Sequence, residues 1–169
     1  MSARRLLRRR QGGVSLVEFT LVAPLFFLLL MVLADFSKAV YDKNTLDAAA
    51  REGVRRAILV NSPTTSDVIA AIKQHSSALS LPTSGCVFDS SHTAPTTGNT
   101  GYIYLSAPPG GGNGSYTPPA GCTTPAVAGN HSQVTVTIVY RYAPFTPILS
   151  QVVGNHITFT STSTFTTDY

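Results

Sequence analysis

A single carboxylate, Glu18, interrupts the first apolar stretch of the chain. It is the fifth residue after Gly13, which follows a basic start. The arginines of that start are Arg4, Arg5, Arg8, Arg9 and Arg10. A carboxylate costs about 2.5–3.5 kcal/mol at the middle of a bilayer and less near its edge. A charged residue with this energetic cost indicates a function, so Glu18 is the first candidate functional residue.

Proteolysis after Gly13 would give Glu18 a chemical partner. Val14 would then carry a free ammonium group one helical turn before the carboxylate, and the two charges could pair within one helix or between neighbouring subunits. Such a pair would set the register of stacked helices. Glycine suits the cut position because a protease needs an unhindered, extended backbone there. The alternative is that Glu18 is an interfacial carboxylate near the end of a membrane anchor.

The two cysteines, Cys86 and Cys122, form the second candidate pair. If the chain after the apolar stretch is exported, an oxidising compartment favours a disulfide between them. Closing this loop would remove about 4 kcal/mol of entropy from the unfolded chain in the loop-closure model. Two free buried thiols are the alternative. Metal ligation is not expected, because neither a C-x-x-C motif nor a histidine cluster accompanies the cysteines.

The remaining residues contain no catalytic constellation. The histidines are scattered without metal-ligand spacing, and neither H-E-x-x-H nor G-x-S-x-G occurs. They are His75, His92, His131 and His156. The glycine-rich segment 110–114 lacks the Gly-Lys-Ser/Thr ending of a phosphate-binding loop, so a flexible loop is the favoured interpretation. We therefore expect a protein that is not an enzyme and has no cofactor or metal.

The apolar stretch that carries Glu18 predicts a transmembrane helix. Residues 14–34 reach roughly the 20 residues that a bilayer needs, with Pro24 as an irregularity. Five of the twelve Lys and Arg residues lie in the first ten positions, so the rest of the chain has seven against eight Asp and Glu residues. Arginines beside an apolar span favour a cytoplasmic N-terminus and an exported C-terminus. A nucleic-acid-binding arm is the alternative.

The helical pattern continues beyond this span. Apolar or small residues recur every three or four positions from 36 to 60, with Lys43 as the exception. The members of this stripe are Phe36, Ala39, Lys43, Leu46, Ala50, Gly53, Ala57 and Val60. One helix from Val14 to Leu59 would be on the order of 70 Å long.

Charges and a stop signal belong to the same helix. The i,i+4 spacing predicts two ion pairs in the favourable order, Asp47 with Arg51 and Glu52 with Arg56. Asn61-Ser62-Pro63 predicts the end of the helix.

The next region consists mostly of turn-forming residues. A second helix is expected from Ser66, as its N-cap, to about Ala78. Segment 80–130 is rich in Gly, Pro, Ser and Thr and predicts a long surface loop that the cysteine pair holds at its ends. Short strands are expected at 86–88 and 102–105.

The end of the chain predicts an antiparallel sheet. Alternating residues at 134–142 and 157–166 indicate two strands, with one face on the helix stripe and a Thr-lined face in water. Charged residues make up only 12% of the chain, which suits an exported β-rich domain. The expected fold class is α+β. The expected segments are a leader at 1–13, a transmembrane helix at 14–34, its extension at 35–60 and an extracytoplasmic α+β domain at 61–169.

Several of these features, in this order, resemble one protein family. The Arg-rich leader, Gly13 and Val14-Ser15-Leu16-Val17-Glu18-Phe19 are similar to the class III signal of type IV-type prepilins, in which a prepilin peptidase cuts after Gly. With the later motifs, they resemble the TadE-like pseudopilins of the tight-adherence (Tad/Flp) pilus system. Those motifs are Leu21-Val22-x-Pro24-Leu25, Leu46-x-x-Ala49-Ala50-Arg51-Glu52-Gly53-x-Arg55 and the strands at 134–138 and 158–164.

The resemblance implies a pilin-like minor pseudopilin required for biogenesis of Flp/Tad pili, which serve adhesion, biofilm formation and secretion. By position, Gly13 is the cleavage residue, Glu18 the assembly carboxylate and Phe19 its aromatic companion. The large β domain departs from the short major pilins, so a shaft subunit is not expected, and a TadF-like role stays open.

The resemblance also implies the partners and the location. The implied partners are a prepilin peptidase, other Tad pseudopilins, the Flp pilin, the inner-membrane assembly platform and the lipid bilayer, with no nucleic acid. The implied location is the bacterial inner membrane, crossed once, with a cytoplasmic N-terminus and a periplasmic or extracellular domain that can enter the pilus.

Two other functions stay open. The chain could be an exported or signal-anchored surface-binding protein with an adhesive β domain, whose Ser/Thr/Gly-rich loop and Thr face bind a surface or a carbohydrate. Alternatively, Val32-Leu33-Ala34 fits a signal-peptidase site, and a cut there would release a soluble protein that starts at Asp35. Against this cut, Glu18 would have no role in a discarded signal, and the helical stripe continues in register through the site.

Overall fold

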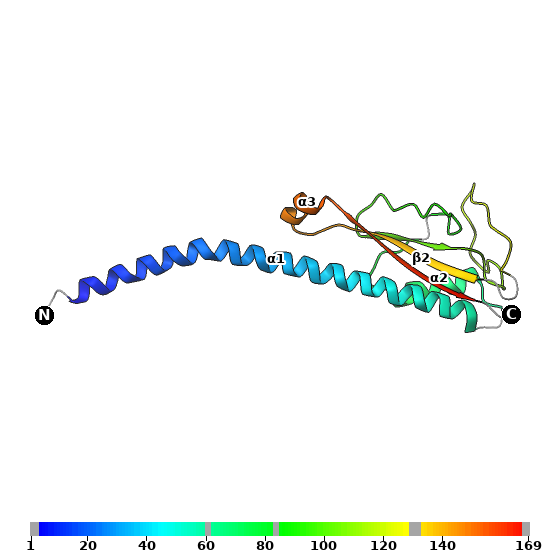
Figure 1. Cartoon of the computed structure of the whole chain (residues 1–169), viewed down its shortest axis with the longest axis horizontal. Helices are drawn as coiled ribbons and strands as arrows, with labels where there is room; N and C mark the ends of the chain where they lie inside the picture. Colours follow the sequence, from blue (N-terminus) through cyan, green and yellow to red (C-terminus); the bar gives the residue numbers. More distant parts are fainter. Residues whose placement is uncertain (1–3, 60–61, 83–84, 129–132, 167–169) are drawn as a thin grey trace. The chain divides into compact units, whose positions relative to one another are not determined.

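The computed structural model describes the backbone of residues 4–59, 62–82, 85–128 and 133–166, and the side chains of the first helix from Gly13 to Ile58. Its elements follow one another along the chain in Figure 1. They are α1 (Arg4–Leu59), α2 (Thr65–His75), β1 (Thr100–Leu105), β2 (Gln133–Tyr142), α3 (Pro147–Val153) and β3 (Ile157–Thr166). By internal contacts, the chain divides into an N-terminal unit, Met1–Lys38, and a C-terminal unit, Ala39–Tyr169.

The N-terminal unit consists of the first part of α1. Large apolar side chains are exposed on all sides of this helix, for example Leu16 at 65%, Leu21 at 76% and Leu25 at 69%. A helix that is apolar all round needs a lipid or protein environment. By length and composition α1 can cross a membrane, which fits a single-pass anchor or a signal sequence. Helix α1 continues through Pro24.

The C-terminal unit is an α+β domain. Its sheet is antiparallel, with the strand order β1-β2-β3. The part of α1 that lies in this unit packs with α2 on one face of the sheet, where the alternating residues of β2 meet the small residues of the helices. The buried residues of this core include Leu46, Ala50, Val54, Ala57, Val68, Ile72, Val134, Val136, Ile138, Tyr140 and Tyr142. The predicted fold class is therefore confirmed.

The predicted stripe of α1 is buried over part of its length. Leu46, Ala50 and Ala57 have no exposed surface, so the close contact expected of small residues is confirmed. Phe36 is 65% exposed and does not belong to the buried stripe. Val60 lies outside the described residues.

The two ion pairs predicted on α1 are wrong, because each acidic residue pairs with a different cation. Asp47 pairs with Lys43 at 2.6 Å, and Glu52 pairs with Arg55 at 2.7 Å. The first change has a tertiary cause, because Lys43 also donates a hydrogen bond to a carbonyl of β3 at 3.0 Å. Spacing within one helix cannot reveal this second acceptor.

Helix α2 begins and ends earlier than predicted. Its N-cap is Thr64, not Ser66. The Thr64 hydroxyl accepts a hydrogen bond from the Asp67 amide at 3.2 Å, and the Asp67 carboxylate accepts one from the Thr64 amide at 3.0 Å. This capping box satisfies two donors at once. The helix ends at His75, three residues before Ala78.

The strand predicted at 86–88 is absent. A turn takes its place, closed by a hydrogen bond from the Asp89 amide to the Cys86 carbonyl at 3.1 Å. The prediction at 102–105 is confirmed, and β1 begins two residues earlier, at Thr100.

The outer face of the sheet is only partly exposed. Segment 89–97 covers its β1 side, where the Tyr104 hydroxyl donates to the Thr93 carbonyl at 2.6 Å and Arg141 donates to the Pro95 carbonyl at 3.1 Å. The Thr-lined surface in water is therefore confined to β3, where Thr158, Thr160, Thr162, Thr164 and Thr166 are exposed.

Candidate processing and assembly site

Gly13, Val14, Glu18 and Phe19 all lie on α1 in exposed positions. Val14 is 61% exposed and Phe19 is 69% exposed. A Cβ atom added at Gly13 would meet no other atom within 4 Å, so packing does not require glycine at this position. A requirement for glycine here would therefore come from a molecule that acts on this peptide bond.

Glu18 has no cation beside it in the part of the chain whose side chains are described. Because Val14 and Glu18 are four positions apart on one helix, their side chains point to the same face. In the uncut chain the Val14 nitrogen is a neutral amide. Only a cut before Val14 would place a positive charge one turn from the carboxylate.

The backbone at Gly13 is helical, whereas an extended backbone is expected at a cut site. Helix α1 begins at Arg4, ten residues before the predicted start at Val14. A peptidase that requires an extended substrate must therefore unwind this turn. The paired glycines at 12 and 13 lower that cost, since each is about 1 kcal/mol less favourable in a helix than alanine.

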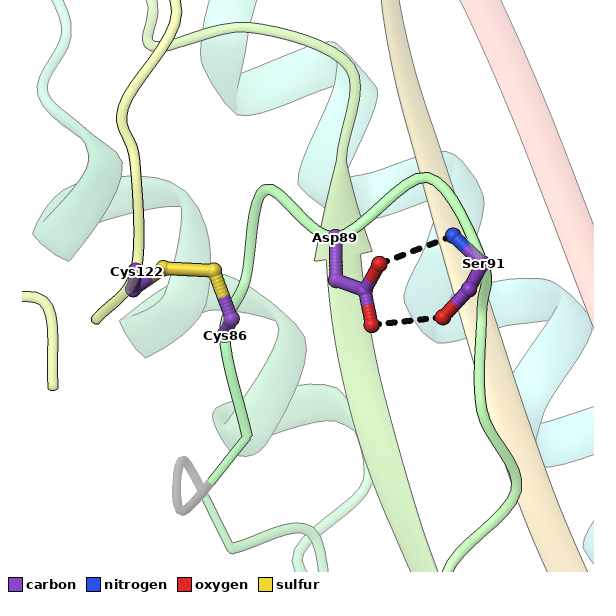
Figure 2. The surroundings of a disulfide bond; sticks show 4 residues. All are labelled: Cys86, Asp89, Ser91 and Cys122. Carbon is purple, nitrogen blue, oxygen red and sulfur yellow. Dashed lines mark hydrogen bonds between the residues drawn. A yellow bond between two sulfur atoms is a disulfide. The ribbon is translucent and has the colours of Figure 1, made fainter.

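The second candidate pair is a disulfide. Cys86 and Cys122 are bonded, with their Cα atoms 5.6 Å apart and a separation of 36 positions in the chain. Figure 2 shows the bond joining two loop segments, with Asp89 turned away from it toward Ser91. Hydrogen bonds from the Ser91 hydroxyl and amide lower the pKa of Asp89. The predicted pairing is confirmed.

The glycine-rich segment is bound along the start of α2 and is no free loop. The Gly111 amide donates to the Pro63 carbonyl at 2.8 Å, and the Thr65 amide donates to the Gly112 carbonyl at 2.9 Å. A Cβ atom at Gly111 would collide with the carbonyl of Ser62, so this approach needs glycine. Carbonyls of the segment thus occupy donors of α2 that a phosphate would otherwise take.

A polar link between α1 and β3 is the feature that sequence analysis missed. The Ser161 hydroxyl donates to the Asp47 carboxylate at 2.6 Å, across 114 positions of the chain. Burial opposes ionisation of Asp47, but hydrogen bonds from Lys43 and Ser161 outweigh it, so the pKa of Asp47 is lowered. In the sequence, the sign of this link is that Asp47 places a charge within the region of the predicted apolar stripe.

The histidines are not brought together. His75 lies 3.9 Å from Glu52, His92 contacts the ring of Tyr104, and His156 meets Arg141 at 2.8 Å. His131 lies outside the described residues. Within the ranges that the structure describes, no group of three or more His, Cys, Asp or Glu residues could hold a metal ion.

Part of α1 is similar to a described protein family. Residues 13–55 match the family model described as TadE-like protein. No curated protein and no solved structure matches the chain. The match covers less than half of the chain, and the similarity suggests a role in Tad pilus assembly. The segment that begins at Gly13, contains Glu18 and ends at Arg55 is thus similar to the TadE-like protein family.

Proposed function

We propose that this chain is a minor pseudopilin of the Tad/Flp pilus, held in the bacterial inner membrane by residues 14–34 and cut after Gly13 by a prepilin peptidase. The observation that carries the proposal is the position of the family match, which begins at Gly13 and includes Glu18. The exposed position of both residues supports it. The arginines before Gly13 favour a cytoplasmic N-terminus.

In this proposal, the cut creates the partner that Glu18 needs. The new ammonium group at Val14 pairs with a Glu18 carboxylate in the same helix or in a neighbouring subunit. A pair between subunits fixes the axial register of adjacent helices, because a slip by one turn would leave both charges in lipid. The C-terminal unit is large for a repeated shaft subunit, which favours a role at the start or the tip of the filament.

The first test is the intact mass of the protein from bacterial membranes with and without the peptidase. We expect a peptidase-dependent loss of residues 1–13. Gly13→Val should block the cut without unfolding the protein, since a side chain there meets no other atom within 4 Å. Gly12→Ala is the matched control and should still be cut. A soluble product that begins at Asp35 would contradict the proposal.

The second test separates processing from assembly. Glu18→Gln keeps the shape of the side chain and removes its charge, so we expect a chain that is cut and membrane-bound but does not support pilus formation. Thr20→Val is the control, because the Thr20 hydroxyl donates to the Val17 carbonyl of the same helix, at 2.9 Å. Normal piliation with Glu18→Gln would remove the proposed role of the carboxylate.

A further inference from the structure

Contacts between α1 and the sheet show which parts of α1 and β3 lie at the same end of the C-terminal unit. Lys43 bonds to the Thr160 carbonyl at 3.0 Å. Ten residues further along α1, a Cβ atom at Gly53 would lie 3.6 Å from Val136, which is paired with Ser163. Advancing along α1 therefore means advancing along β3 toward Thr166. The opposite end of the unit, where α1 enters at Ala39, is the end where β2 finishes and β3 begins.

The connection between β2 and β3 lies at this end. Segment 143–156 contains α3 and carries no Asp, Glu, Lys or Arg residue. Its Phe145 is 73% exposed. On α1 at the same end, Val40 is 43% exposed and Tyr41 is 59% exposed. Phe145, Val40 and Tyr41 thus expose apolar surface at the end of the unit that holds this uncharged connection.

Chain connectivity keeps this end close to the apolar stretch of α1. Ala39 follows Ala34 by only five positions. Helix α1 runs through both residues, so these five positions rise only about 7.5 Å. The interfacial layer extends about 5–7 Å beyond the hydrocarbon on each side of a bilayer. If residues 14–34 span the bilayer, Ala39 therefore lies close to the depth of the lipid headgroups.

We propose that Phe145, with Val40 and Tyr41, contacts the interfacial layer of the bilayer, so that the β2–β3 connection is a second membrane contact of this protein. The inference rests on the proposed function, since it requires residues 14–34 to be a membrane anchor. Aromatic side chains are favoured at headgroup depth, where one side is apolar and the other wet. An uncharged connection also loses no ionic hydration on contact with lipid.

The chain contains no tryptophan, so one substitution creates a single fluorescent probe. Phe145→Trp puts the probe on the proposed contact. Phe165→Trp is the matched control, because Phe165 is also exposed, at 54%, but pairs with Val134 at the far end of the sheet. The full-length variants are placed in phosphatidylcholine vesicles whose acyl chains are brominated close to the headgroup. We expect about a twofold loss of fluorescence for Phe145→Trp and none for Phe165→Trp, because only the first probe reaches interfacial depth.

Flotation of the same vesicles separates failure of this inference from failure of the anchor. A protein that floats with the vesicles but shows no quenching at 145 would overturn the lipid contact and leave the anchor intact. Equal quenching at both positions would also overturn it. Protection of the probe at 145 from aqueous acrylamide without lipid quenching would indicate a protein contact instead. A protein that does not float would overturn both the anchor and this contact.

Discussion

The disulfide is expected to supply a large part of the stability of the C-terminal unit. Cys86 and Cys122 are 36 positions apart. For a closed loop of this size, the loop-closure relation gives about 4 kcal/mol of stabilisation, because the bond restricts the unfolded chain. An unfolding entropy of about 2.1 cal/mol/K per residue over the unit Ala39–Tyr169 converts this into a fall in melting temperature of about 15 °C when the bond is removed.

The perturbation is the double variant Cys86→Ala/Cys122→Ala, compared with the oxidised and the reduced natural protein in detergent. Thermal unfolding is followed by near-ultraviolet circular dichroism of the tyrosines, because all seven lie in the C-terminal unit. Far-ultraviolet signals would be dominated by α1. Ser90→Ala, on the same exposed segment, is the control and should change stability by less than about 0.5 kcal/mol.

A fall of less than about 4 °C in the double variant would refute the loop-closure argument. It would mean that the unfolded chain without the bond is already nearly as restricted as the cross-linked one. A fall of the expected size in the double variant but not in the reduced protein would point instead to the loss of the sulfur atoms from their packing.

Two further predictions concern the core of the C-terminal unit. Gly53→Val should destabilise the unit by about 1–3 kcal/mol in denaturant unfolding, because even a Cβ atom at Gly53 would lie 2.6 Å from Ile72, which has no exposed surface. Gly13→Val should leave the same transition unchanged, and equal effects of the two would contradict the packing argument. Burial raises the pKa of Tyr104 and of Tyr140 to about 12, so the stability that their neutral forms contribute is complete below pH 10.0 and lost as the pH rises through 12. Absorbance titration should show these two of the seven tyrosines ionising together with unfolding, and a single transition of all seven near their ordinary pKa would refute the assignment.

Residue patterns within a single segment were enough to predict the helices and strands that depend on that segment alone. The apolar run and the three-to-four spacing predicted α1 to Leu59, because a helix needs only its own backbone bonds and one buried stripe. Strict alternation predicted β2 and β3 in the same way. The true start of α2 was also within reach of local analysis, since Thr64 and Asp67 have the spacing of a capping box.

Other features depend on segments that are far apart in the chain. The partner of Asp47 could not be predicted, because Ser161 comes 114 positions later and competes with nearer charges on the helix. The glycine-rich segment looked flexible for the same reason. Its order comes from backbone bonds to residues 63–66, and nothing within residues 110–114 records them.

The sequence by itself determined the parts of the candidate site that act as a linear motif: the basic leader, Gly13, and Glu18 one turn after Val14. A peptidase and a bilayer can recognise such a segment without a folded domain. The tertiary structure alone decided that β3 carries the exposed threonines, that segment 89–97 covers the rest of the sheet, and that the β2–β3 connection lies at the end of the unit that holds Ala39. These properties follow from which surfaces are buried against one another, and burial is a relation between segments that no single segment encodes.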